Sequence, residues 1–87
     1  MKKLTVLLFI LLSIPAFAQT TAIPDANFEQ ALIDLGHDTG SPDGSVLTAN
    51  ISGLAALDVY GKAINDLTGI EDFIGLYYLD CRNNSLT

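Results

Sequence analysis

Two aspartates in a polar stretch, Asp38 and Asp43, are the side chains best placed by type and spacing to hold a metal ion. The run 43–46, Asp-Gly-Ser-Val, matches the D-G-x-hydrophobic centre of an EF-hand calcium loop. In that register the first ligand position is Thr39, and Asn50 occupies the twelfth, where a bidentate glutamate is required. One carboxylate in the register cannot hold calcium tightly, although Asp38 could contribute from the neighbouring position.

The same stretch has a simpler interpretation as a turn. In Pro42-Asp43-Gly44 the proline fixes φ and the glycine accepts positive φ, as a turn requires. The sequence therefore predicts no cofactor and no strong metal site, and weak calcium binding through Asp38 and Asp43 is the alternative.

A second group of residues has the chemistry of molecular recognition rather than catalysis. Tyrosine and arginine are enriched among the residues that dominate binding energy at interfaces. No nucleophile–base set and no metal-ligand cluster occurs in the sequence, so we predict a binding surface and not an enzyme. The predicted binding residues are Asp58, Tyr60, Tyr78, Asp80 and Arg82.

The element that must position these residues is a repeat of 22 residues. The apolar residues of a first copy, residues 54–64, recur 22 positions later in a second copy, residues 76–86. The second copy fits the pattern L-x-x-L-x-L-x-x-N-x-L. Cys81 fills one leucine position and Asn84 fills the asparagine position, where its amide can satisfy unpaired backbone groups. The structural set is Leu54, Leu57, Val59 and Ile64, followed by Leu76, Leu79, Cys81, Asn84 and Leu86.

Each repeat should begin with a short strand, at 57–59 and again at 79–81. Alternation along a strand then directs the structural set inward and the binding residues outward, so that Asp58 lies beside Asp80 and Tyr60 beside Arg82. Between the strands, apolar residues recur at every third position from 64 to 76, which favours a 3₁₀ or irregular segment over an α-helix.

A helix is predicted over about 25–35, because Phe28, Ala31, Leu32 and Leu35 form one apolar face. Asp25 can cap its N-terminus. One apolar stripe of this length needs a surface to cover, and the open end of a repeat array provides one. Residues 19–50 are therefore predicted to form an N-terminal cap, composed of this helix and a polar loop.

Residues 1–18 have the order of a secretory signal peptide: two lysines, an apolar run over 4–14, and Ala16-Phe17-Ala18 before Gln19. We predict cleavage between Ala18 and Gln19, a secreted or cell-surface location, and no membrane insertion afterwards. Residues 19–87 then carry two basic residues against all ten acidic ones, a net charge of −8. This acidity argues against nucleic acid as a partner.

The repeat residues, together with the preceding helix, resemble the 22-residue, internalin-like class of secreted bacterial leucine-rich repeat proteins. The resemblance implies an α+β solenoid in which a capping helix precedes short parallel strands on a concave face and 3₁₀ or irregular segments on a convex face. Residues 51–87 would be its first repeats, cut off from a longer protein. It also implies a non-catalytic scaffold for adhesion or for binding a protein or carbohydrate; the alternative is the recognition part of a larger secreted enzyme.

Overall fold

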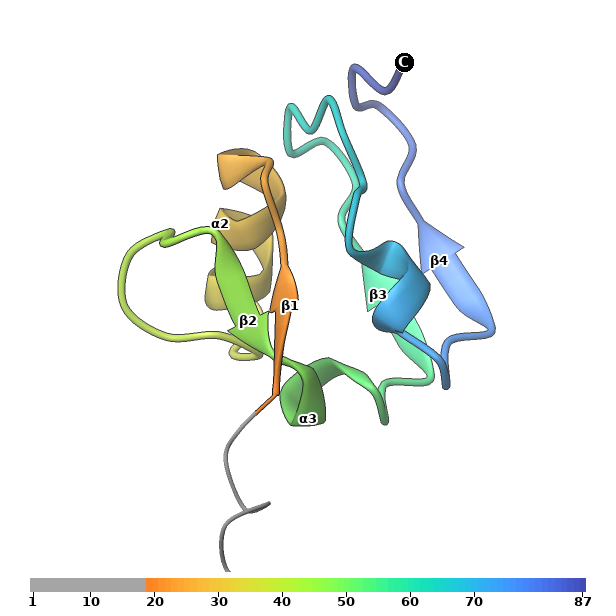
Figure 1. Cartoon of the computed structure of the whole chain (residues 1–87). Helices are drawn as coiled ribbons and strands as arrows, with labels where there is room; N and C mark the ends of the chain where they lie inside the picture. Colours follow the sequence, from red (N-terminus) through yellow and green to blue (C-terminus); the bar gives the residue numbers. More distant parts are fainter. Residues whose placement is uncertain (1–18) are drawn as a thin grey trace, which may run out of the picture.

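The computed structural model describes residues 19–87, so the predicted signal peptide lies outside the described residues. Two small two-stranded sheets and a nine-residue helix dominate this part of the chain (Figure 1). No helix among these residues is long and apolar enough to cross a membrane. In chain order the elements are β1 (Thr20–Ala22), α2 (Ala26–Asp34), β2 (Ser45–Leu47), α3 (Thr48–Ile51), β3 (Ala56–Asp58), the 3₁₀ turn η2 (Ile70–Asp72) and β4 (Tyr78–Asp80).

Strands β3 and β4 form a parallel pair whose register equals the sequence repeat. Leu57 pairs with Leu79 and Asp58 with Asp80, each 22 positions apart. Each strand begins one residue earlier than predicted, and the ladder continues past β3 through the bond from the Val59 N–H to the Asp80 carbonyl (2.8 Å). The return segment contains η2, a short 3₁₀ turn of the kind that the three-residue spacing favours.

Helix α2 begins directly after Asp25, whose Oδ1 accepts from the N–H groups of Asn27 (2.8 Å) and Phe28 (3.0 Å). These are two of the four N–H groups that a helix start leaves unpaired. The helix ends at Asp34 with Leu35 as its C-cap, and Gly36 follows with φ +88°, as a left-handed helix stop requires. Leu35, predicted to lie on the buried face, is exposed because its C-cap position leaves it beyond the last helical turn.

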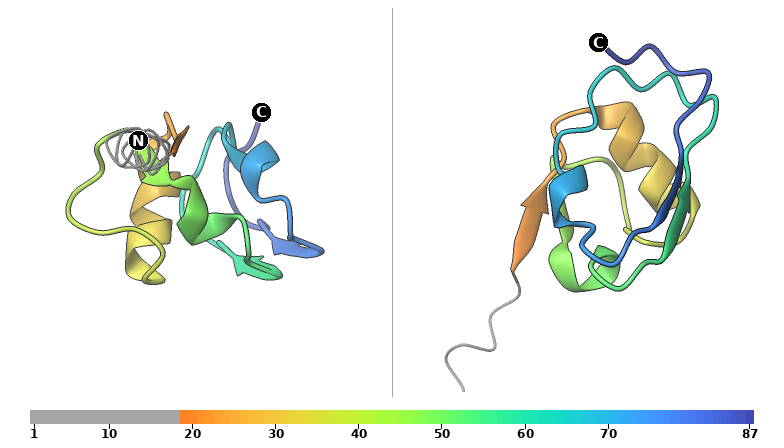
Figure 2. Two further views of the ribbon diagram at one scale, coloured as in Figure 1. Left: turned by 60° about the horizontal axis from the view of Figure 1, so that its bottom comes forward. Right: turned by 90° about the vertical axis from the view of Figure 1, so that its right-hand side faces the viewer.

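The polar loop predicted for the rest of the cap is wrong in part. Residues 45–47 form β2, which pairs antiparallel with β1, and the one-turn helix α3 runs across the predicted domain boundary at residue 50. Strands of three residues are too short to show an alternation of apolar and polar residues, and β1 consists only of Thr-Thr-Ala. No local sequence pattern therefore indicated this pairing. The β1–β2 pair lies beside α2 at the end of the molecule away from β4 (Figures 1 and 2).

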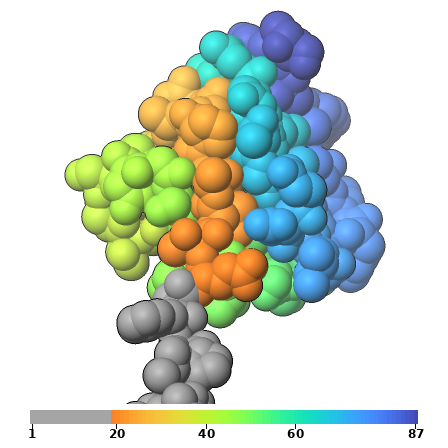
Figure 3. All heavy atoms as spheres, in the orientation of Figure 1, coloured from red at the N-terminus to blue at the C-terminus, as the bar shows by residue number. Residues whose placement is uncertain are grey.

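The cap and the repeats share one hydrophobic core. Phe28 of α2 is stacked on Phe73, which follows η2, with ring centroids 6.0 Å apart. Gly69 lets the return segment approach β1 closely: a Cβ there would lie 2.6 Å from the Ala22 carbonyl oxygen, and its φ is +106°. Figure 3 shows the β1 segment filling the space between the 40s loop and the return segment. The buried residues are Ile23, Phe28, Ala31, Leu32, Val46, Ile51, Leu57, Val59, Ile64 and Phe73.

Most of the predicted inward positions pack as expected. Leu57, Val59 and Ile64 are fully buried, and four others are partly buried against the same core: Leu54, Leu76, Leu79 and Cys81. Leu86 is the exception, because 39% of its surface is exposed and no described segment covers it.

Candidate binding surface and acidic cluster

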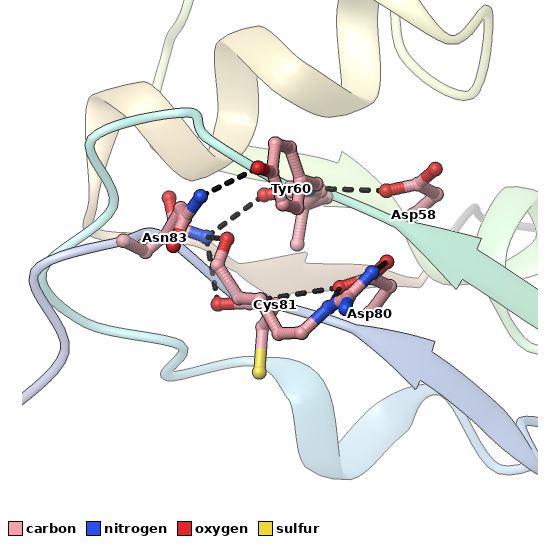
Figure 4. Close-up of polar contacts among 8 residues, drawn as sticks. Asp58, Tyr60, Asp80, Cys81 and Asn83 are labelled. Carbon is pink, nitrogen blue, oxygen red and sulfur yellow. Dashed lines mark hydrogen bonds and ion pairs between the residues drawn. The ribbon is translucent and has the colours of Figure 1, made fainter.

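The parallel register places the predicted binding residues in columns across β3 and β4. Tyr78 lies beside Ala56, and Asp58 lies beside Asp80. The ladder bond from the Gly61 N–H to the Arg82 carbonyl (3.0 Å) carries the same register one step further, so that Tyr60 lies beside Arg82. All five predicted residues therefore share one face of the pair, and Figure 4 shows three of them, Asp58, Tyr60 and Asp80, at the carboxyl ends of the strands.

The two aspartates in the middle column perform the same local task in both repeats. Asp58 Oδ1 accepts from the N–H of Tyr60 (3.1 Å), and Asp80 Oδ1 accepts from the N–H of Arg82 (3.2 Å). Each bond joins residues two apart and closes the turn that ends the strand, as aspartate commonly does. The two carboxylates are therefore structural groups as well as part of the surface.

Asp80 differs from the prediction in being largely covered. Only 9% of its surface is exposed, because the Arg82 side chain folds over it and donates to both carboxylate oxygens (Nε to Oδ1 and Nη2 to Oδ2, both 3.0 Å). The hydrogen bonds from Arg82 lower the pKa of Asp80, and the carboxylate raises the pKa of Arg82 in return. A ligand would meet the guanidinium of Arg82 and little of Asp80.

Arg82 also lies over a tyrosine. Its guanidinium carbon is 5.5 Å from the centroid of the Tyr60 ring, within cation–π range. The Tyr60 hydroxyl accepts from the side-chain amide of Asn83 (2.5 Å) (Figure 4). Tyr60 and Arg82 are thus oriented by neighbours while remaining exposed, and Tyr78 is 53% exposed. The result is a partly ordered aromatic and cationic surface.

Asn84 fixes the turns beneath this surface. Its Oδ1 accepts from the N–H groups of Lys62 (2.9 Å) and Ile64 (3.0 Å) in the preceding repeat, and its Nδ2 donates to three carbonyls, those of Val59, Cys81 and Arg82. Lys62 occupies the asparagine position of the first repeat and cannot accept a hydrogen bond through its side chain. A single asparagine thereby satisfies backbone groups of both repeats.

The structure brings Asp38 and Asp43 together and adds Glu29, a residue that sequence reasoning missed. One ligand oxygen from each of the three carboxylates lies within 4.8 Å of the others. Glu29 is fully buried, and burial, together with the neighbouring Asp38 carboxyl, raises its pKa to about 6. Its position four residues after Asp25, on the polar side of the helix pattern, gave no signal that the loop would fold over it.

No protein-family model, no curated protein and no solved structure matches this chain.

Proposed function

We propose that the chain is a non-catalytic, extracellular interaction module, built of a helical cap and leucine-rich repeats, that binds a protein or carbohydrate through the β3–β4 face. The single observation that carries this proposal is the 22-residue parallel register, which gathers Tyr60, Tyr78 and Arg82 as exposed groups on one side of the sheet.

The chemistry of this face suits recognition. Tyrosine rings provide apolar contact area with a polar tip, and arginine adds five hydrogen-bond donors in a fixed plane. Because Arg82 is held by Asp80 and stacked on Tyr60, part of the entropy cost of ordering it on binding is already met. The acidic net charge disfavours nucleic acid, whereas a neutral polysaccharide or a protein surface meets no such repulsion.

The test compares a double variant, which removes both tyrosines of the β3–β4 face, with a variant of a neighbouring tyrosine outside that face. Tyr60 and Tyr78 are replaced together by alanine, and Tyr77→Ala serves as the control, since Tyr77 directly precedes β4 and is 86% exposed but lies outside the columns. Binding is measured by affinity electrophoresis in gels containing neutral polysaccharides, and by surface plasmon resonance against purified extracellular proteins.

We expect the double variant to lose at least about tenfold in affinity, because two exposed aromatic anchors are removed. Its urea midpoint should match that of the unmodified protein, and Tyr77→Ala should bind normally. Equal losses in the double variant and the control, or unchanged binding in the double variant, would contradict the assignment of the binding face.

A further inference from the structure

A buried carboxylate with a free oxygen marks a site in the cap that is separate from the β3–β4 face. Glu29 is 0% exposed, and its Oε2 is buried without a hydrogen-bond partner. The same holds for Oδ2 of Asp38. Buried polar atoms are nearly always paired in native proteins, so two unpaired oxygens in one cluster of carboxylates need a physical explanation.

The three carboxylates are all held in place by backbone N–H groups through one oxygen each. Glu29 Oε1 accepts from the N–H groups of Asp43 (2.9 Å) and Gly44 (2.7 Å). Asp38 Oδ1 accepts from the Thr39 N–H (2.8 Å), and Asp43 Oδ1 accepts from the Ser45 N–H (3.1 Å). The loop is therefore wrapped around Glu29, and one carboxylate oxygen from each of the three residues lies within 4.8 Å of the other two.

Within residues 19–87 no basic side chain forms an ion pair with this group. The only ion pair among the described residues joins Arg82 to Asp80, on the other sheet. Carboxylates this close cannot all ionise at low cost without a positive charge between them. The raised pKa of Glu29 expresses the same conflict. Either a proton or a cation must relieve it.

The dimensions match a calcium ion. Calcium–oxygen distances are about 2.3–2.6 Å, so two oxygens on opposite sides of one ion are separated by roughly 4.6–5.2 Å. The ligand oxygens of the three residues lie within 4.8 Å of one another, and one ion can contact all of them with little movement. A pocket of about 230 Å³ beside Asp38 and Asp43 leaves room for water ligands, and Thr39, Ser45 and Asn50 also line it.

We propose that Glu29, Asp38 and Asp43 form a calcium site that fastens the 36–44 loop to helix α2. An all-oxygen set without histidine or cysteine favours a hard cation over zinc. Calcium accepts irregular coordination on a loop, whereas magnesium demands a near-ideal octahedron at about 2.0–2.1 Å. Three carboxylates with water completing the shell suit dissociation constants on the order of 10⁻⁴–10⁻³ M, the range of extracellular calcium modules.

The test measures calcium binding to the purified, EDTA-treated protein. Calorimetric titration with CaCl₂ at pH 7.5 should give one site, and the melting temperature should rise with CaCl₂ but not with NaCl of equal ionic strength. Glu29→Gln keeps an acceptor for the Asp43 and Gly44 N–H groups while removing the central charge. It should lose the calcium heat and the calcium-dependent rise in melting temperature.

Two further variants serve as a charge control and as a second test of the ligands. Asp34→Asn removes one charge from an exposed position on the same helix and should bind calcium as the unmodified protein does. Asp43→Asn changes an exposed ligand, so it tests the site even if Glu29→Gln fails to fold, and it should weaken calcium binding at least about tenfold.

Three outcomes would overturn the proposal. The first is no calcium heat and no thermal shift at 10-fold above the expected range, about 10 mM. The second is a calcium affinity that is unchanged in Asp43→Asn or in a folded Glu29→Gln protein. The third is a protein that titrates one proton near pH 6 with the same profile at 0 and about 10 mM CaCl₂, since a proton would then occupy the place assigned to calcium.

Discussion

The repeats and the cap differ in how completely their polar side chains are hydrogen-bonded. In the repeats, Asn84 makes five hydrogen bonds, two as acceptor and three as donor, all to backbone groups. In the cap, Glu29 and Asp38 each keep a buried oxygen without a partner. The repeat turn is closed by its own side chain, whereas the cap loop leaves two carboxylate oxygens without a donor. This difference is why a cation is proposed for the cap and not for the Asn84 turn.

The start of helix α2 shows the same contrast between a fully paired and a partly unpaired carboxylate. Asp25 accepts hydrogen bonds from four backbone N–H groups, two in the helix and two, those of Asn65 and Asp66, in the first repeat. Burial opposes its ionisation, but these four bonds outweigh burial and lower its pKa. Four residues on, burial raises the pKa of Glu29. The number of N–H groups that a carboxylate accepts from, and not burial alone, therefore decides whether its pKa is raised or lowered.

The largest effect should come from breaking the core that joins the two regions. Phe28→Ala removes a fully buried ring stacked on Phe73 and should cost about 3–5 kcal/mol of the free energy of unfolding, measured by urea denaturation. Leu35→Ala, at the exposed C-cap of the same helix, should change it by no more than about 0.5 kcal/mol. A Phe28→Ala midpoint equal to that of the unmodified protein would contradict a shared core built around this ring.

Asn84→Ala should cost about 2–3 kcal/mol, because backbone groups of both repeats lose their partner. The matched control is Asn65→Ala, since Asn65 is exposed and donates to Asp25 through its backbone N–H and not its side chain. Equal denaturation midpoints for the two variants would mean that water replaces the Asn84 amide at no cost.

Asp25, the N-cap of α2, and Glu29, in its first turn, should give opposite pH dependences in calcium-free buffer. The folded-state pKa of Glu29, about 6, exceeds its ordinary value of 4.5, so its contribution is fully present below pH 4.5 and is lost as the pH rises through 6. Asp38 and Asp43 face it and oppose its ionisation. The expected loss of unfolding free energy is on the order of 1–2 kcal/mol. Because Glu29→Gln removes the titrating group, its melting temperature should fall less between pH 4.5 and 7.5 than that of the unmodified protein.

Asp25 works in the other direction. Its lowered pKa stabilises the fold above its ordinary value of 3.8, and this stability is lost as the pH falls through the folded-state pKa. Asp25→Asn should therefore be less stable than the unmodified protein at neutral pH, with a gap that narrows below pH 3.8. A gap independent of pH would indicate that shape and not charge matters at this N-cap.

The smallest effect on stability should come from the β3–β4 face. Arg82→Ala removes the cation–π contact with Tyr60 and the ion pair with Asp80, and it should lower the urea midpoint less than the variants above, because the Arg82 side chain is 76% exposed. Lys62→Ala removes the same charge from an unpaired position and controls for net charge. A loss for Arg82→Ala comparable to that for Asn84→Ala would make the face a structural element and weaken its assignment to binding.

The sequence alone determined the parts of the structure that depend on spacing along the chain. A 22-residue period fixes which residues become neighbours in a parallel pair, so the juxtapositions of Asp58 with Asp80 and of Tyr60 with Arg82 could be predicted before any coordinates. The capping role of Asp25 was equally local, because an N-cap acts on the next two or three residues.

Tertiary structure alone decided the parts that depend on how separate segments meet. The pairing of β1 with β2, the reach of Asp25 to Asn65 over 40 positions, and the wrapping of Asp43 onto Glu29 over 14 positions have no periodic signal in the sequence. Glu29 occupies an ordinary polar helix position, and only the loop that folds over it makes it a buried, partly unpaired carboxylate. Its environment is created by long-range packing, which residue spacing does not encode.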